Sequence, residues 1–198
     1  MLAENTEKYD VKEIENILTH EECDILIEFA KCRKDWETSQ FYSNIIDSKK
    51  GSYQKTDKDI RNSKTLLLND KDHPIIQKIA LITELLTGLP LNTQEDLQIT
   101  HYNTDGKFHP HYDANNMYGG QRRATLIIYL NDDFEGGETV FTKLDKIITP
   151  KKGHGLLFLN TDSSDEIIAD SMHQGNKVIA GEKWICTKWS HSKRYEPF

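Results

Sequence analysis

His111 and Asp113 are separated by one residue, and His173 and Lys183 follow further along the chain. Two imidazoles and one carboxylate can occupy one face of an octahedral iron(II) and leave three positions open. A His-x-Asp pair supplies two such ligands where a strand runs out into a turn, so the third must come from a distant strand that folds back beside it. Lys183 lies ten residues after His173 and would supply a fixed cation for the carboxylate of a co-substrate.

A zinc hydrolase is a second interpretation of the same segment. His109, His111 and Asp113 resemble the start of the His-x-His-x-Asp-His run of binuclear zinc hydrolases. Ala114 stands where that run needs a ligand, and Pro110 interrupts regular strand pairing. We therefore predict that His109 is a neighbour of the metal site and not a ligand. A catalytically silent binding module is a further alternative.

Composition and charge limit the partners of the chain. The 198 residues carry 25 basic and 32 acidic side chains, a net charge of −7, which opposes attraction to nucleic acid. Three cysteines without a Cys-x-x-Cys pair argue against a disulfide framework. The polar N-terminus and the absence of a long apolar run indicate neither a secretory signal nor a membrane span. We expect a soluble intracellular protein in a reducing compartment, while the oligomeric state is not predicted.

Two amphipathic helices are expected in the first half of the chain. Thr19 is a suitable N-cap for a helix over residues 20–34, with Glu22 three residues later. A second helix is expected from Pro74 to Leu86. The charged stretch 47–59 between them predicts a mobile loop, either a surface insertion or a lid over an active site.

Short apolar strands separated by turn residues dominate the second half of the chain. The expected strands are 97–102, 124–130, 138–141, 155–159, 177–179 and 183–189. Many short strands of this kind are typical of a jelly roll. We predict an α+β fold with a double-stranded β-helix core over residues 96–198. Residues 1–95 would form an N-terminal helical support whose helices pack on one sheet, giving one structural domain overall.

Short motifs follow one another in order from about residue 60 to residue 195. They are Arg61-Asn62-Ser63, Tyr102-x-x-x-Gly106, His109-Pro110-His111-Tyr112-Asp113, Gln121-Arg122-x-Ala124-Thr125, Glu135-Gly136-Gly137-Glu138-Thr139-x-Phe141, His173-x-Gly175 and Gly181-x-Lys183-Trp184. In this order they resemble the prolyl 4-hydroxylases, a branch of the iron(II)- and 2-oxoglutarate-dependent dioxygenases. The first motif departs slightly, because Asn62 stands where the family has threonine.

The resemblance implies an iron enzyme. His111, Asp113 and His173 would bind Fe(II), and no further catalytic residue is expected. The co-substrates would be 2-oxoglutarate and O₂, with ascorbate as an expected requirement. Decarboxylation of 2-oxoglutarate to succinate would be coupled to hydroxylation of a proline in a peptide or protein. The same chemistry on a lysyl residue, a free amino acid or a nucleobase is the alternative, and the acidic charge opposes the last of these.

The resemblance also assigns the co-substrate site. Lys183 would hold the distal carboxylate of 2-oxoglutarate, with Tyr102 and Thr139 beside it and Thr187 as a weaker candidate. The residues themselves favour this role for the lysine. Lys183 alternates with core residues on its strand, and an unpaired buried ammonium is costly, so an inward lysine must meet a negative group.

Arg122 and Trp189 match family positions that face the peptide. An indole suits a proline ring, and a guanidinium can donate to a peptide carbonyl. Proline-rich peptides are already extended as polyproline II, so binding them costs less entropy. Phe108 stands where relatives often have tyrosine, so one hydrogen bond to the substrate is lost at this position.

Overall fold

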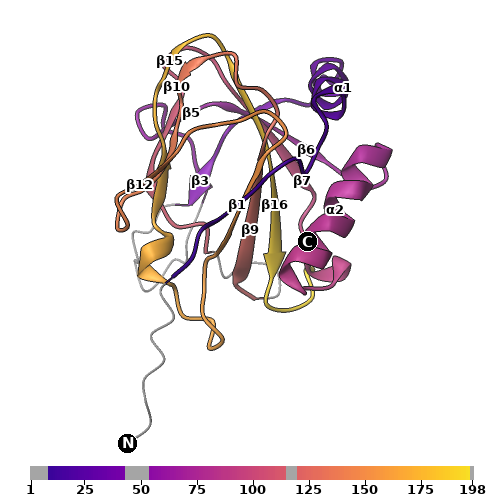
Figure 1. Ribbon diagram of the computed structural model, residues 1–198, viewed down its shortest axis with the longest axis vertical. Coiled ribbons are helices and arrows are strands. Elements are labelled where there is room, and N and C mark those ends of the chain that lie inside the picture. The colour runs from indigo at the N-terminus through magenta and orange to yellow at the C-terminus, as the bar shows by residue number, and fades with distance from the viewer. Residues whose placement is uncertain (1–8, 43–53, 115–119, 197–198) are drawn as a thin grey trace, which may run out of the picture.

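Two antiparallel β-sheets form the centre of the computed structural model, which describes residues 9–42, 54–114 and 120–196 (Figure 1). The larger sheet has the strand order β1 (Lys12–Ile14), β13 (Gly155–Leu159), β9 (Arg122–Tyr129), β16 (Lys183–His191), β7 (Leu97–Tyr102), β6 (Lys64–Leu68), β2 (Glu37–Thr38). The smaller sheet has the order β12 (Lys146–Ile148), β11 (Thr139–Phe141), β14 (His173–Gly175), β8 (Lys107–His111), β5 (Arg61–Asn62).

From β7 onward the chain passes back and forth between the two sheets. β7, β9, β13 and β16 belong to the larger sheet, and β8, β11, β12 and β14 belong to the smaller one. Two short ribbons complete the strands: β10 (Glu135–Gly136) with β15 (Val178–Ala180), and β3 (Phe41–Tyr42) with β4 (Gln54–Lys55). This alternation is that of a double-stranded β-helix, so the jelly-roll core predicted from the strand pattern is confirmed, within a fold that is mostly β and not an even mixture of α and β.

Two helices precede the jelly roll, as expected. Helix α1 spans His20–Lys31 and begins with a capping box between Thr19 and Glu22. It ends three residues earlier than predicted, because the N–H groups of Cys32 and Arg33 bond back to the last turn and close it. Helix α2 spans Pro74–Thr87 and ends at a left-handed Gly88. The single turns η1 (Leu91–Thr93) and η2 (Ala169–Ser171) complete the helical segments among the described residues.

One buried cluster joins both helices to the outer face of the larger sheet. Leu26 of α1 and Ile79 of α2 are fully buried and share this cluster with Ile99 of β7 and Cys186 of β16. In Figure 1 both helices lie on the same side of the sheet, beside β6, β7 and β16. Burying such side chains stabilises the fold by roughly 1.5–3 kcal/mol each.

Strand β16 is buried along its whole length because both of its faces are covered. Side chains alternate between the faces of a strand, so β16 serves two surroundings. Trp184 and Cys186 pack toward the helices. Lys183 and Trp189 point to the other face, where they line a cavity between the sheets. The strand therefore carries core residues and site residues in strict alternation.

The proposed division at residues 95 and 96 stays a prediction. Strand β6, before that boundary, pairs with β7 after it, so hydrogen bonds cross the division. The predicted mobile loop 47–59 falls largely on residues 47–53, which lie outside the described residues. Of the rest, residues 54–55 form β4 and residues 58–59 belong to a turn that ends at residue 60.

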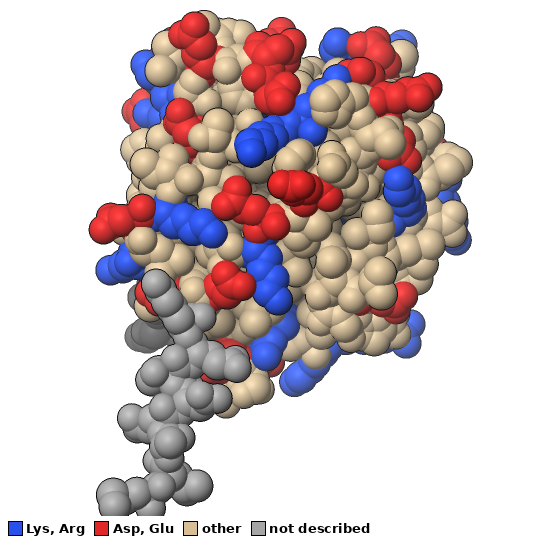
Figure 2. Space-filling view, viewed as in Figure 1, with Lys and Arg blue, Asp and Glu red and all other residues tan. Residues whose placement is uncertain are grey.

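The described surface mixes charges of both signs. On the face shown in Figure 2, Asp and Glu side chains alternate with Lys and Arg, and the basic side chains form no continuous track. Within the described ranges, neither helix has the length and apolar character needed to cross a bilayer.

Candidate metal and co-substrate site

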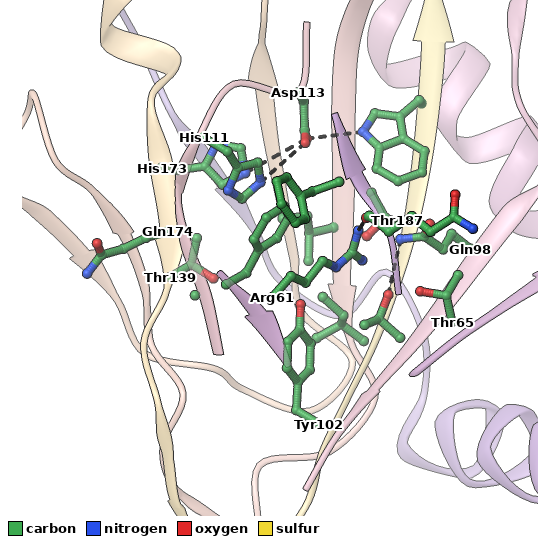
Figure 3. Close-up of a pocket in the computed structure, with 18 of the residues that line it drawn as sticks. Arg61, Thr65, Gln98, Tyr102, His111, Asp113, Thr139, His173, Gln174 and Thr187 are labelled. Atoms are coloured by element: carbon green, nitrogen blue, oxygen red, sulfur yellow. Dashed lines mark hydrogen bonds and ion pairs between the residues drawn. The ribbon is translucent and has the colours of Figure 1, made fainter. Parts of the chain in front are cut away.

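His111, Asp113 and His173 come together at one end of the smaller sheet (Figure 3). His111 ends β8, Asp113 follows two residues later, and His173 begins β14. β8 and β14 are antiparallel neighbours in which His111 and His173 face each other in register. The ligand atoms of the three residues all lie within 4.8 Å of one another. The distance from His111 Nε2 to Asp113 Oδ1 is 3.5 Å, and from His173 Nε2 to Asp113 Oδ2 it is 3.8 Å.

Backbone carbonyls fix the orientation of both imidazoles. His111 Nδ1 lies 2.8 Å from the carbonyl oxygen of His109, and His173 Nδ1 lies 2.9 Å from that of Ser171. A carbonyl only accepts, so each Nδ1 carries the proton and each Nε2 keeps its lone pair for a metal. Burial, with a contribution from the neighbouring His111, lowers the pKa of His173 to about 4. Both rings therefore present the nitrogen that a divalent metal requires.

The Asp113 carboxylate is buried and held by donors. Its Oδ2 accepts hydrogen bonds from Thr125 Oγ1 at 2.9 Å and from Trp189 Nε1 at 3.0 Å. Burial alone would raise the pKa of this carboxyl, but His173 and His111 bring it far below its usual range. The group is therefore an anion, and a triad of two neutral imidazoles and one carboxylate fits Fe(II).

His109 does not take part in this cluster. Its side chain is exposed, and the group of potential metal ligands found among the described residues holds only His111, Asp113 and His173. The backbone of His109 nevertheless contributes, through the carbonyl that accepts from His111. This placement agrees with a neighbour of the site and leaves the zinc-hydrolase interpretation without its first ligand.

Lys183 is a buried cation that faces the same cavity. The residue is only 3% exposed, and its Nζ donates to the carbonyl of Gly137 at 2.6 Å. No carboxylate in the described part of the chain forms an ion pair with it. Burial lowers the pKa of the ammonium to about 8, although the Glu138 carboxylate raises it. A buried ammonium bonded only to a carbonyl suits a carboxylate delivered by a ligand.

Four hydroxyl side chains lie on the Lys183 side of the site. Tyr102 is its register partner on β7, and Lys183 Nζ lies 5.5 Å from the Tyr102 ring and 5.7 Å from the Tyr129 ring. The Tyr129 hydroxyl donates to Thr139 Oγ1 at 2.8 Å. Thr187 lines the same cavity two positions further along the face of β16. Tyr129 was not predicted as a site residue, although its position on the same face of β9 as Thr125 could have indicated that it lies near the site.

The metal triad, Lys183 and the hydroxyl side chains of Tyr102, Thr139 and Thr187 line one cavity of about 1030 Å³, whereas Tyr129 lies behind Thr139. The cavity wall also includes the aromatic side chain of Trp189. Figure 3 shows Tyr102 and Thr139 on the side of the cavity away from Asp113. The volume accommodates a small dicarboxylate together with a segment of peptide.

Comparisons with known proteins identify this arrangement. Residues 97–191 match the model of the 2OG-Fe(II) oxygenase superfamily. Prolyl 4-hydroxylase 5 of Arabidopsis thaliana is 33% identical over 205 residues, which cover 91% of this chain and 68% of the relative. The bovine prolyl 4-hydroxylase subunit alpha-1 is 32% identical over 145 residues, or 69% of this chain and 27% of that protein. The chain belongs to the prolyl 4-hydroxylase family.

A solved structure shares the whole fold. The viral collagen prolyl hydroxylase vCPH from Paramecium Bursaria Chlorella virus-1, in complex with 2OG, has a TM-score of 0.73 and 28% identity, covering 95% of this chain and 98% of that one. This family member is thus a dioxygenase that depends on Fe(II) and 2-oxoglutarate. The triad and the buried lysine are the features of its own structure that fit those two groups.

The predicted substrate residues of this family member pack against each other. The Arg122 guanidinium lies 3.8 Å above the Trp189 ring and is paired with both oxygens of Glu95. His191 Nε2 also lies 2.8 Å from Glu95 Oε1. Burial raises the pKa of Glu95, but Arg122 and His191 outweigh it and lower the pKa to about 2. Glu95 was missed because it follows no local pattern; its partners lie on β9 and β16.

Arg61 is a second cation that the site predictions left out. Its guanidinium is buried, with Nη1 donating to the Gln40 carbonyl at 2.6 Å and the group lying 4.5 Å above the Phe108 ring. The Phe108 ring in turn stacks on His111, with 3.5 Å between ring centres. An imidazole that close fills one face of the phenyl ring, so Arg61 takes the other. Phe108 therefore packs between a cation and a ligand of the candidate metal site.

Proposed function

We propose that this dioxygenase hydroxylates a proline within a peptide or protein, as a prolyl 4-hydroxylase, with 2-oxoglutarate converted to succinate. His111, Asp113 and His173 would hold Fe(II) through Nε2, a carboxylate oxygen and Nε2. When bound, the iron supplies the activation of O₂ that couples decarboxylation to hydroxylation. The observation that carries the proposal is Lys183, a buried cation without a carboxylate partner among the described residues, in one cavity with the triad.

Lys183 would bind the distal carboxylate of 2-oxoglutarate. The ligand would replace the Gly137 carbonyl as the main acceptor for Nζ, which gives a charge-assisted hydrogen bond at a buried position. The hydroxyl of Tyr102 and that of Thr139, held by Tyr129, would donate to the same carboxylate. These residues orient the co-substrate so that its other end reaches the metal triad.

Arg122, Trp189 and Arg61 would contact the peptide. The Arg122–Trp189 stack lies in the cavity wall next to Asp113, so a proline ring placed over it lies close to the metal. A guanidinium such as that of Arg61, bonded to one backbone carbonyl and lining the cavity, can donate to a peptide carbonyl as well. The names of the plant, bovine and viral relatives support proline as the target.

The helices would act as support for this site. α1 and α2 cover the outer face of the sheet whose inner face carries Lys183 and Trp189. Packing on the outer face would hold β16 in place without any contact between the helices and the ligands.

The test is hydroxylation of defined peptides. Purified protein with Fe(II), 2-oxoglutarate and ascorbate is incubated with a proline-rich peptide, a peptide with one proline and a matched peptide in which lysine replaces proline. We expect one added oxygen on proline by fragment mass spectrometry, with succinate formed in step. A Lys183→Ala variant provides the control for 2-oxoglutarate dependence. Oxygen added only to the lysine peptide, or to neither while 2-oxoglutarate is consumed, would contradict the proposed substrate.

A further inference from the structure

Two buried side chains lie in a row behind the Asp113 carboxylate. Asn160 Nδ2 donates to Thr125 Oγ1 at 2.8 Å, and Thr125 Oγ1 donates to Asp113 Oδ2 at 2.9 Å. Thr125 and Asn160 are both fully buried. Their places are set by the larger sheet, since β13 pairs with β9 and the Asn160 N–H then bonds to the Arg123 carbonyl. The row therefore belongs to the rigid part of the fold.

The donor and acceptor groups of Asn160, Thr125 and Asp113 fix the direction of the two hydrogen bonds in this row. A threonine hydroxyl has one hydrogen and can accept from other donors. Because Thr125 Oγ1 accepts from the Asn160 amide, its own hydrogen points to Asp113. The opposite orientation of the Asn160 amide would place an oxygen against the hydroxyl, and Thr125 would then have two acceptors for one hydrogen. The ionised Asp113 can only accept, so Thr125 donates to it, and the Asn160 amide, from which the same hydroxyl accepts, holds the hydroxyl in that orientation.

The two oxygens of Asp113 differ in the number of hydrogen bonds that they accept. Oδ2 accepts from both Thr125 and Trp189, which uses its two in-plane lone pairs. Oδ1 keeps its lone pairs and lies 3.5 Å from His111 Nε2. We propose that Asn160 and Thr125 are positioning residues that restrict Asp113 to binding the metal through Oδ1 alone. This inference rests on the proposed role of the triad as the Fe(II) site.

Single-oxygen binding has a consequence for the reaction. A facial triad leaves three metal positions open for co-substrate and O₂. A carboxylate free to turn and bind through both oxygens would occupy one of them. Donors fixed on Oδ2 oppose that turn, because it would leave the Thr125 hydroxyl and the Trp189 N–H buried without an acceptor. Thr125 and Asn160 therefore keep the three metal positions open for co-substrate and O₂, and they also maintain the affinity of the site for the metal.

Calorimetric titration with Mn(II), without turnover, tests the proposal. Thr125→Val keeps the shape of the side chain and removes the hydroxyl, so we expect about 10–100-fold weaker Mn(II) binding. Asn160→Leu removes the directing amide and should weaken binding by about tenfold. Thr125→Ser restores the donor and should bind nearly as the wild type does. The matched control is Thr83→Val, which removes a buried hydroxyl on α2 that bonds only within its helix.

The visible spectrum of Co(II)-loaded protein gives a second readout. A change of Asp113 from one to two bound oxygens alters the coordination number, so the bands should shift in Thr125→Val and Asn160→Leu but not in Thr83→Val. Thermal unfolding of each variant shows whether it is folded. If Thr125→Val does not fold, the comparison of Asn160→Leu with Thr83→Val decides the question.

The outcomes separate this inference from the proposed function. Wild-type affinity for Mn(II) in folded Thr125→Val, or in Asn160→Leu, would overturn the positioning role. His111→Ala tests the metal site itself. If it binds Mn(II) as tightly as the wild type, the assignment of the triad fails. If it loses binding while the two row variants keep it, only the positioning role is refuted.

Discussion

The pKa of Lys183 leads to a specific pH dependence of 2-oxoglutarate binding. Burial places this pKa at about 8 in the protein without ligand, below the usual 10.5. The ammonium is therefore about 90% charged at pH 7, half charged at pH 8 and about 10% charged at pH 9. A carboxylate binds the charged form, so binding above pH 8 requires uptake of a proton. The dissociation constant should rise about tenfold between pH 7 and pH 9.

The assay is titration of 2-oxoglutarate into Mn(II)-loaded protein across this pH range. Lys183→Arg serves as the control, because arginine stays charged throughout and should give a much flatter profile, whatever its absolute affinity. Lys183→Ala should lose about 1.5–3 kcal/mol of binding free energy at pH 7, or about 10–150-fold in affinity. A wild-type profile as flat as that of the arginine variant would refute the assigned role of Lys183, as would unchanged affinity in the alanine variant.

Three further predictions concern the ligands, the charges and the core. His111→Ala should abolish 2-oxoglutarate turnover and His109→Ala should leave most of it, which a succinate assay measures; equal loss would revive the zinc interpretation. Glu95→Gln should cost about 3–5 kcal/mol at pH 7, because it removes the carboxylate that pairs with both Arg122 and His191. The native pKa of Glu95 is depressed to about 2, so the stabilisation by its carboxylate is present above pH 4.5 and is lost as the pH falls toward 2. The difference in the free energy of unfolding between the wild type and the glutamine variant, measured by urea unfolding, should therefore become smaller in that range. Leu26→Ala should lower the free energy of unfolding by about 2–5 kcal/mol, whereas Leu85→Ala, at an 83% exposed position of α2, should change it little; similar losses would contradict the core described above.

The spacing of the ligands made the metal cluster predictable. A His-x-Asp pair at the end of a strand needs only one more ligand, and β14 supplies it as the antiparallel neighbour of β8. Lys183 was predictable for a related reason, because a lysine that alternates with Trp184 and Cys186 on a buried strand must face inward. In both cases the chemistry lies in residues close together on single strands, where periodicity can be read directly.

The groups that hold the ligands were not predictable in the same way. The run containing Thr125 was interpreted as an apolar strand that begins with a family motif, and no role was assigned to Thr125, although it interrupts the apolar run on the inner face. Asn160 and Glu95 follow no local pattern, since their partners come from strands more than twenty residues away. The substrate role of Trp189 stays a prediction. Its N–H is bonded to Asp113, so only the face of its indole is offered to a peptide.

The alternation of β16 explains why one short strand can serve both the fold and the site. Trp184 and Cys186 are buried in one cluster with the helices, so their packing fixes the position and twist of the strand. Lys183 and Trp189 then stand at opposite ends of the same inner face, one at the cation site proposed for 2-oxoglutarate and the other against Asp113. The distance between the proposed carboxylate anchor, Lys183, and the metal triad is thus set by a stretch of regular strand between two packed layers. A flexible loop in that position would allow the separation to vary, and 2-oxoglutarate, which must reach both ends at once, would bind more weakly.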